Sequence, residues 1–258
     1  MSLTTSGKNA SSSTKSTARS PIIVRPARLT DGYRMGWIAA VTYNNTSLTD
    51  MLAPHRHQYF EHYVRGFQQR ATARTFDARH MGYVAVEASN PSVVVGYAHF
   101  VRLGDDEGAK RQIASRNALL LWVLGWLFSV YCKVFGLFVG GDKSADLDAI
   151  KWFENVGKAD EEKHFQSHPE RVNRWHTQSC VVLKEFQGRG AGKLLMGQVV
   201  KRAEAEGVPV GLEASMEGER LYRSVGFKVL SRFSLVLSEA DRDTGGFMLW
   251  SPSAWENK

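Results

Sequence analysis

Residues 180–195 read CVVLKEFQGRGAGKLL, and this stretch decides the fold. An apolar strand leads into a turn with glycines at positions 188, 190 and 192, and a helix begins near Gly192. Glycine lets the main chain turn sharply and come close to a ligand, so several backbone N–H groups can point at one spot. The first amides of the helix and the positive end of its dipole favour a bound phosphate there.

The spacing of these glycines excludes two common phosphate loops. The dinucleotide pattern Gly-x-Gly-x-x-Gly would need a glycine at position 193, where the chain has Lys193. The phosphate loop of nucleotide hydrolases needs a Ser or Thr hydroxyl to hold magnesium, and Leu194 stands at that position. What remains is Gln187-x-x-Gly190-x-Gly192 directly after a strand.

A second segment follows at the distance that one helix and one strand would fill. Residues 208–215 form an apolar run typical of a buried strand. Residues 219–227, ERLYRSVGF, predict a short helix that ends at Gly226 and leads into another strand at residues 228–230.

Together the two segments resemble the GNAT superfamily of acyl-CoA N-acyltransferases. The loop from Gln187 to Gly192, with Phe186 before it, is similar to the GNAT pyrophosphate loop, and Leu221-Tyr222-x-x-x-Gly226-Phe227 is similar to the pattern that ends the GNAT core. The run Glu213-Ala214-Ser215 before that pattern looks like a family of fungal GNAT proteins. The resemblance covers residues 22 to about 237.

The resemblance implies an α/β fold. Its mixed, mostly antiparallel central sheet is splayed between strands 4 and 5 and flanked by helices, with an apolar helical insertion between strands 3 and 4. The earlier elements fit this order: a strand at 22–27, a helix capped by Thr30-Asp31, a helix at 55–74, and a hairpin of residues 81–87 and 93–103 around Asn90-Pro91.

Length and composition predict one enzyme-sized domain. The chain has 258 residues, 43% of them apolar, enough for a sizeable core. We expect a single domain over 21–258, with its insertion at about 105–172, after a Ser/Thr/Lys-rich tail at 1–20 that lacks acidic residues and should be disordered. Cys132 and Cys180 are too few for a disulfide framework. We therefore expect a cytoplasmic protein, in preference to a mitochondrial or membrane-peripheral one.

The formal net charge of +7 helps to attract a polyanion such as CoA. No stripe of Lys and Arg with interleaved aromatic residues is present, so we expect no nucleic-acid partner. The histidines show no metal-ligand spacing with a supporting carboxylate cluster, and we expect no metal.

Residues 118–139 are almost wholly apolar and long enough to span a bilayer. One crossing would place the strands before and after this segment on opposite sides of the membrane, where they could not pair in one sheet. We expect one or two buried helices that cover the acceptor side of the sheet. Peripheral membrane contact and a dimer surface are the alternatives.

The resemblance also implies a set of residues that bind acetyl-CoA. The backbone groups of Val181 and Val182 would contact the pantetheine arm, and the loop would bind the pyrophosphate. The full predicted set is Val181, Val182, Gln187, Gly188, Arg189, Gly190, Ala191, Gly192, Lys193 and Ser215.

Amide formation needs a group that takes a proton from the acceptor amine and a group that helps the thiolate to leave. Tyr222 matches the GNAT tyrosine that can protonate the CoA sulfur. His176, at the start of the fourth strand, and Glu213, on the fifth, compete for the acceptor-side role. Some relatives carry a second histidine where this chain has Gln178, a departure that weakens a direct histidine base.

These features predict an N-acetyltransferase that moves acetyl from acetyl-CoA to a primary amine of a small molecule, by direct attack in a ternary complex. A CoA-binding regulatory or membrane-associated module without turnover is one alternative, and a protein lysine or N-terminal acetyltransferase is another. The acceptor is left open, because GNAT pockets are built from variable loops. An acidic lining would imply a polyamine, and an aromatic lining an arylalkylamine.

Overall fold

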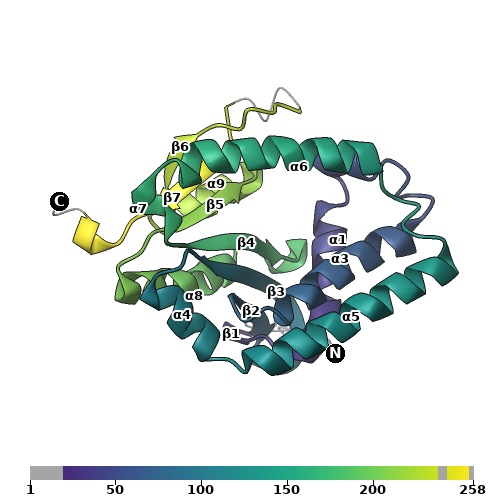
Figure 1. The fold of residues 1–258 in the computed structure, drawn as a ribbon, viewed down its shortest axis with the longest axis horizontal. Coiled ribbons are helices and arrows are strands. Elements are labelled where there is room, and N and C mark those ends of the chain that lie inside the picture. Colours follow the sequence, from purple (N-terminus) through teal and green to yellow (C-terminus); the bar gives the residue numbers. More distant parts are fainter. Residues whose placement is uncertain (1–19, 238–242, 256–258) are drawn as a thin grey trace, which may run out of the picture.

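A computed structural model describes residues 20–237 and 243–255. The predicted disordered tail lies outside these residues except for Ser20. Within them the strands form one seven-stranded sheet in the order β1-β2-β3-β4-β5-β7-β6 (Figure 1). The strands are β1 Ile22–Pro26, β2 His80–Glu87, β3 Asn90–Leu103, β4 Arg174–Val182, β5 Val210–Ala214, β6 Lys228–Ser231 and β7 Gly246–Trp250.

The sheet is antiparallel except between β4 and β5. These two strands pair over a short stretch and then diverge. They pair in parallel only over Trp175–Thr177 and Val210–Leu212. Beyond Thr177, β4 continues beside β3 alone as far as Val182. The predicted fold, with its splay between the fourth and fifth strands, is confirmed.

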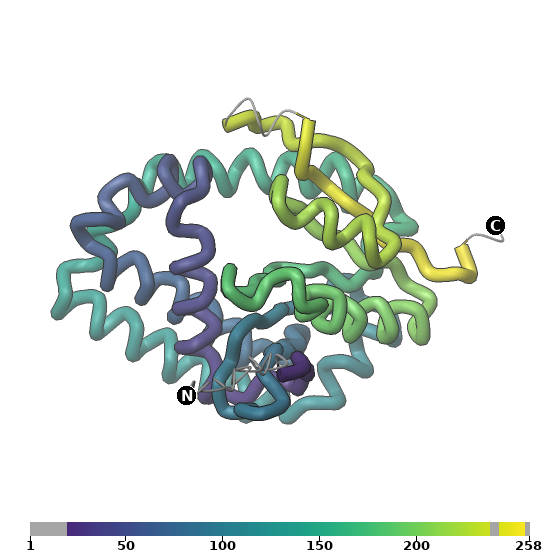
Figure 2. Tube along the Cα trace, turned by 180° about the vertical axis from the view of Figure 1, so that it is seen from behind, coloured from purple at the N-terminus to yellow at the C-terminus, as the bar shows by residue number. Residues whose placement is uncertain are grey.

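Helices cover both faces of the sheet. Successive strand residues point to opposite faces, and both faces carry apolar side chains that the helices bury. On one face α1 (Gly32–Tyr43) and α3 (Phe60–Thr75) pack through Met35, Ile38 and Ala71. On the other face α8 (Ala191–Glu206) packs through Leu195 and Val199 (Figure 2). The short helices α2 (Ser47–Leu52) and α9 (Met216–Arg223) complete the core region.

Several local predictions differ from the structure. Asp31 precedes α1, but its carboxylate binds Arg25 (2.7 Å) and the N–H of Arg28 (2.7 Å) and caps no α1 amide. The second predicted helix is α3, which begins at Phe60, and α2 was not predicted. The hairpin pairs Glu87 with Asn90, so Asn90-Pro91 begins β3 and the turn lies just before it. The sheet also extends beyond position 237, because β7 inserts between β5 and β6.

The insertion between β3 and β4 is helical. It consists of α4 (Glu107–Ala114), α5 (Ala118–Val139), α6 (Leu147–Glu161), a π-helical turn at Glu162–Gln166 and α7 (Pro169–Val172). Short 3-10 turns lie elsewhere, at Leu29–Asp31, Lys184–Phe186 and Ser253–Trp255.

The prediction that residues 118–139 are buried is wrong. They form the single helix α5, which lies along the outer side of α3 at the edge of the molecule (Figures 1 and 2). By length and composition α5 could cross a membrane, with a mean hydropathy of 1.8, yet only 6% of that apolar window is buried. The side chains of α3 that face α5 include Arg65, Gln68 and Gln69, so the sheet's apolar core does not reach α5.

Candidate active site

The glycine loop connects the end of β4 to α8, and its backbone adopts the shape that the sequence predicts. Gly188 has φ +72° and Gly190 has φ +83°, in the left-handed region that favours glycine. Gly190 is the N-cap residue of α8, which begins at Ala191. The first-turn amides of α8 therefore lie beside an open turn in which a Cβ at either glycine would meet no atom within 4 Å. This geometry suits a pyrophosphate.

The side chains of the loop mostly hold it in place. Arg189 forms an ion pair with Glu87 (2.7 Å) at the end of β2, and its guanidinium lies over the Phe186 ring (5.2 Å). Gln187 donates to the carbonyl of Val182 (2.9 Å). Lys193 is exposed in the first turn of α8. Arg189 and Gln187 thus hold the loop, while its main chain and the exposed Lys193 side chain take part in none of these contacts.

Gly192 has a packing role. A Cβ there would lie 2.7 Å from Cδ2 of Leu221, so this glycine lets α8 and α9 approach closely.

The register of β4 decides which backbone groups face the splay. Leu183 donates its N–H to the carbonyl of Val95 (3.0 Å), and Val181 lies opposite Tyr97. Because alternate residues of an antiparallel pair point their N–H and C=O at the partner, Val181 turns these groups to β3. Cys180 turns both groups to the open edge. Val182 turns its N–H there, while its carbonyl accepts the hydrogen bond from Gln187. Cys180 and Val182, and not Val181, therefore have backbone groups at the open edge, and the pantetheine contacts of Val181 and Val182 stay predictions.

His176 and Glu213, which the sequence left as competitors, form one pair. Nε2 of His176 lies 3.0 Å from Oε2 of Glu213 across the paired part of β4 and β5. Since an ionised carboxylate only accepts hydrogen bonds, Nε2 carries the proton. Nδ1 is buried without a protein partner, and the Phe165 ring packs edge-on against the imidazole (5.6 Å). The histidine side chain is 10% exposed and the glutamate side chain 40%.

The exposed member of the pair is therefore the carboxylate. Burial alone would raise the pKa of Glu213, but the adjacent His176 and the Arg174 guanidinium lower it below its ordinary value of 4.5. Glu213 is thus ionised at neutral pH, with His176 orienting it from behind. It can bind a cationic amine and take a proton through water.

Tyr222 lies on α9, buried beside the splay. Burial raises its pKa well above the ordinary value of 10, and the nearby Cys180 and Glu213 act in the same direction. The hydroxyl is therefore protonated at neutral pH, as a proton donor must be. Its ring also packs against Phe227 (5.9 Å), so the residue contributes to the core as well.

Ser215 has a structural role, and its predicted contact with the cofactor stays a prediction. Its hydroxyl accepts the N–H of Gly218 (3.2 Å) and caps α9. The structure therefore brings the loop, the open edge of β4, the His176–Glu213 pair and Tyr222 together around the splay, and it gives Ser215 a local role.

Sequence reasoning missed two features of this region. The first is Cys180. Its residue type gives no signal of a binding role, and only the strand register shows that its backbone groups do not bond to β3. Arg74 of α3 reaches Ser179 of β4 (Nη1 to Oγ, 3.5 Å), and burial lowers its pKa. It forms no ion pair with any described residue, and no sequence signal distinguishes it from the other arginines of α3.

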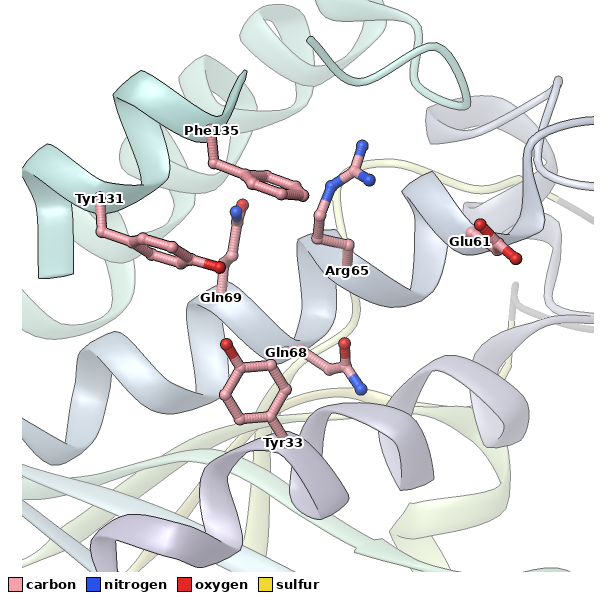
Figure 3. A pocket seen from close by; sticks show the side chains of 7 residues that line it. All are labelled: Tyr33, Glu61, Arg65, Gln68, Gln69, Tyr131 and Phe135. Carbon is pink, nitrogen blue, oxygen red and sulfur yellow. The ribbon is translucent and has the colours of Figure 1, made fainter. Parts of the chain in front are cut away.

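Two further observations concern other ligands. In the described part of the chain no group of three or more His, Cys, Asp or Glu residues could hold a metal ion. A cavity of about 210 Å³ lies between α5, α3 and α1 (Figure 3). Its lining is polar and aromatic: Tyr33, Glu61, Arg65, Gln68, Gln69, Tyr131 and Phe135.

Comparison with known proteins agrees with this geometry. Residues 156–233 match the model of the acetyltransferase (GNAT) domain. No curated protein matches the sequence. A histone acetyltransferase and related acetyltransferase from Corynebacterium glutamicum is similar in structure, with a TM-score of 0.53, 16% identity, and coverage of 92% of this chain and 98% of that one.

Two other solved structures are similar at lower scores. One is the PaiA N-acetyltransferase of Thermoplasma acidophilum in complex with coenzyme A (TM-score 0.46, 10% identity, 89% of this chain and 98% of that one). The other is a GNAT acetyltransferase from Brucella melitensis in complex with acetyl-CoA (TM-score 0.43, 12% identity, 89% of this chain and 87% of that one). The family match and the fold together lead to one conclusion: the chain has the fold of the GNAT acetyltransferases and carries their domain signature in residues 156–233.

Proposed function

We propose that this protein transfers the acetyl group of acetyl-CoA directly to a primary amine of a small molecule, in a ternary complex. The observation that carries the proposal is the position of an ionised, partly exposed Glu213 and a protonated Tyr222 at the same splay of the sheet. One group suits the arriving amine, and the other suits the departing thiolate.

The donor end is formed by main-chain groups. The loop amides and the first turn of α8 would bind the pyrophosphate, and the open backbone of Cys180 and Val182 would align the pantetheine arm. Bound acetyl-CoA would supply a thioester, which an amine can attack. Glu213 would hold the ammonium group of the acceptor and receive its proton through water. Tyr222 would donate its proton towards the sulfur.

The surroundings of the pair favour an acceptor with an anionic group near its amine. Ser179, which contacts Arg74, lies opposite His99, and His176 lies opposite Val101. His99 and Val101 are two residues apart, so their partners Ser179 and His176 lie on the same face of β4, about 7 Å apart along the strand. Arg74, beside Ser179, and Glu213, beside His176, therefore lie on that face as well. A cation facing this region disfavours a polyamine and suits a zwitterionic amine.

The test mixes the protein with acetyl-CoA and a panel of amines and measures free thiol. The panel includes zwitterionic amines, an arylalkylamine, a polyamine and a lysine peptide. Tyr222→Phe should lower kcat by about 100-fold with little change in the KM for acetyl-CoA. Glu213→Gln should raise the KM for the amine and lower kcat. Glu217→Gln, an exposed carboxylate of α9, is the matched control.

Three outcomes would overturn the proposal or a part of it. CoA binding without turnover on any amine would leave a CoA-binding regulatory module. Turnover on the peptide alone would identify a protein acetyltransferase. Full activity of Tyr222→Phe would remove the tyrosine from the chemistry.

A further inference from the structure

Helix α5 presents its most apolar side to solvent. Residues at the spacing of one helix face are exposed along its full length: Leu119, Trp122, Val123, Trp126, Leu127, Val130, Val134, Leu137 and Phe138. Leu137 and Phe138 are 84% and 85% exposed. We call these nine residues the outer face of α5. A helix of a soluble domain normally turns such a face to the core.

The inner side of α5 meets a mixed boundary: Leu121 is buried and Phe128 packs against Phe76 (5.5 Å) in its first half, and polar residues of α3 face its second half. Tyr131 and Phe135 face Gln69, Gln68 and Arg65 across the cavity between α5 and α3 (Figure 3). The Arg65 guanidinium lies over the Phe135 ring (5.5 Å). Turning the helix about its axis would therefore bury the outer face against polar side chains. The outer face needs a partner outside the described domain, since a continuous apolar patch of this size is costly in water.

We propose that the outer face of α5 inserts into the interface of an anionic lipid bilayer, with the helix lying in the membrane plane. The pairing of β3 with β4 over Gly96–Leu103 and Arg174–Val182 keeps both ends of the insertion on one side of any membrane. A single crossing is thus excluded, and a helix in the plane is the arrangement that covers the face. Trp122 and Trp126 suit this depth, because indole rings favour the headgroup boundary.

Charge selects a bilayer over a second copy of the chain. Residues 105–143 contain five cations and four anions, and the carboxylate of Asp142 is hydrogen-bonded to Ser144. The other three anions are paired within the domain: Asp105 with Arg79, Asp106 with Arg102 and Glu107 with Lys110. The cations that flank the helix without an ion pair to a described residue are Arg111 and Arg116 before it and Lys143 after it. The Arg116 guanidinium donates to main-chain carbonyls and forms no ion pair with a described residue. A second copy would bring like charges together, whereas anionic lipids would neutralise them.

Lys133 is compatible with this arrangement. It is the one charged residue within α5. At ~100° per residue its direction falls between those of Trp122 and Trp126, within the outer face, so its long aliphatic chain would lie beside the indole rings and carry the ammonium group to the headgroups.

The test uses the full chain and vesicles of phosphatidylcholine with and without phosphatidylserine, in co-sedimentation without substrates. The wild type should bind the vesicles that contain phosphatidylserine. The double variant Trp126→Gln/Leu137→Gln should lose about tenfold in partitioning. The matched control is Trp152→Gln/Leu147→Gln, which changes the same residue types at exposed positions on α6 and should bind as the wild type. Both double variants should stay folded, since each changes exposed side chains only.

Three results would overturn the proposal: no vesicle binding by the wild type, binding that the α5 variant retains, or an α5-dependent dimer in sedimentation velocity without vesicle binding. The last result would assign the outer face to a second copy. Because the assay contains no acetyl-CoA and no amine, its outcome is independent of the proposed transferase activity.

Discussion

At the scale of single residues, the position of the His176 ring depends on a missing side chain. A Cβ at Gly211 would lie 2.6 Å from Cε1 of Phe165 and 3.3 Å from Nδ1 of His176. Phe165 is fully buried, so its ring has little room to move. Gly211 thus allows the aromatic ring and the imidazole to pack together behind Glu213.

We therefore expect Gly211→Ala to lower the free energy of unfolding by about 1–3 kcal/mol through overpacking. Turnover should fall further than stability alone explains, because His176 would be displaced from Glu213. Gly197→Ala is the control. Gly197 is exposed on α8, and an added Cβ would meet no atom within 4 Å, so this change should raise the free energy of unfolding by about 0.5–1 kcal/mol. Denaturant unfolding and thiol release measure both effects. Equal behaviour of the two variants would contradict this view of Gly211.

At the scale of elements, α9 is tied to the β6–β7 region by one carboxylate. Glu219 accepts hydrogen bonds from Arg223 (2.7 Å), Arg232 (2.6 Å) and the N–H of Gly245 (2.7 Å). The hydrogen bond from Arg232 is the main cause that lowers its pKa to about 2. The helix that carries Tyr222 is thereby anchored to the end of the sheet.

This anchor predicts a pH dependence of stability. The folded pKa is about 2 and the ordinary value is 4.5, so between them the unfolded state binds more protons. The stabilisation is complete above about pH 4.5 and is lost as the pH falls towards 2. Glu219→Gln should cost about 1–3 kcal/mol at neutral pH and flatten the fall of Tm in acid. Glu217→Gln should leave the acid profile unchanged, and identical profiles for both variants would contradict the assignment.

At the scale of the whole molecule, a buried arginine joins the insertion to the sheet and to α8. Arg102 of β3 is fully buried and binds Asp106, the N-cap of α4, at 2.6 Å and Glu206 of α8 at 2.9 Å. The site at the splay lies elsewhere on the sheet, so this cluster bears on folding and not on chemistry.

Arg102→Met should cost about 3–5 kcal/mol, because it leaves two carboxylates facing a buried space without their partner. Arg111→Met, at an exposed position on α4, should cost little. Thermal unfolding followed by circular dichroism measures the difference. Turnover by the folded Arg102→Met protein at low temperature should equal that of the wild type, and a specific loss of turnover would contradict a purely structural role.

The sequence by itself determined the glycine loop that we propose as the donor end of the site. Gly188 and Gly190 identify a left-handed turn because other residues adopt positive φ at a cost. The strand before them, the helix after them and the short helix with Tyr222 are local patterns, and local patterns are readable along the chain.

Only the tertiary structure decided the arrangement of the residues that we propose as the acceptor end. That His176 and Glu213 form one pair follows from the parallel pairing of β4 with β5, and that Cys180 faces the splay follows from the register with β3. The exposure of α5 could not be predicted from the sequence either, because an apolar run has the same composition in a core as on a surface. Strand register and burial are set by contacts between distant segments, and the spacing of residues along the chain does not encode them directly.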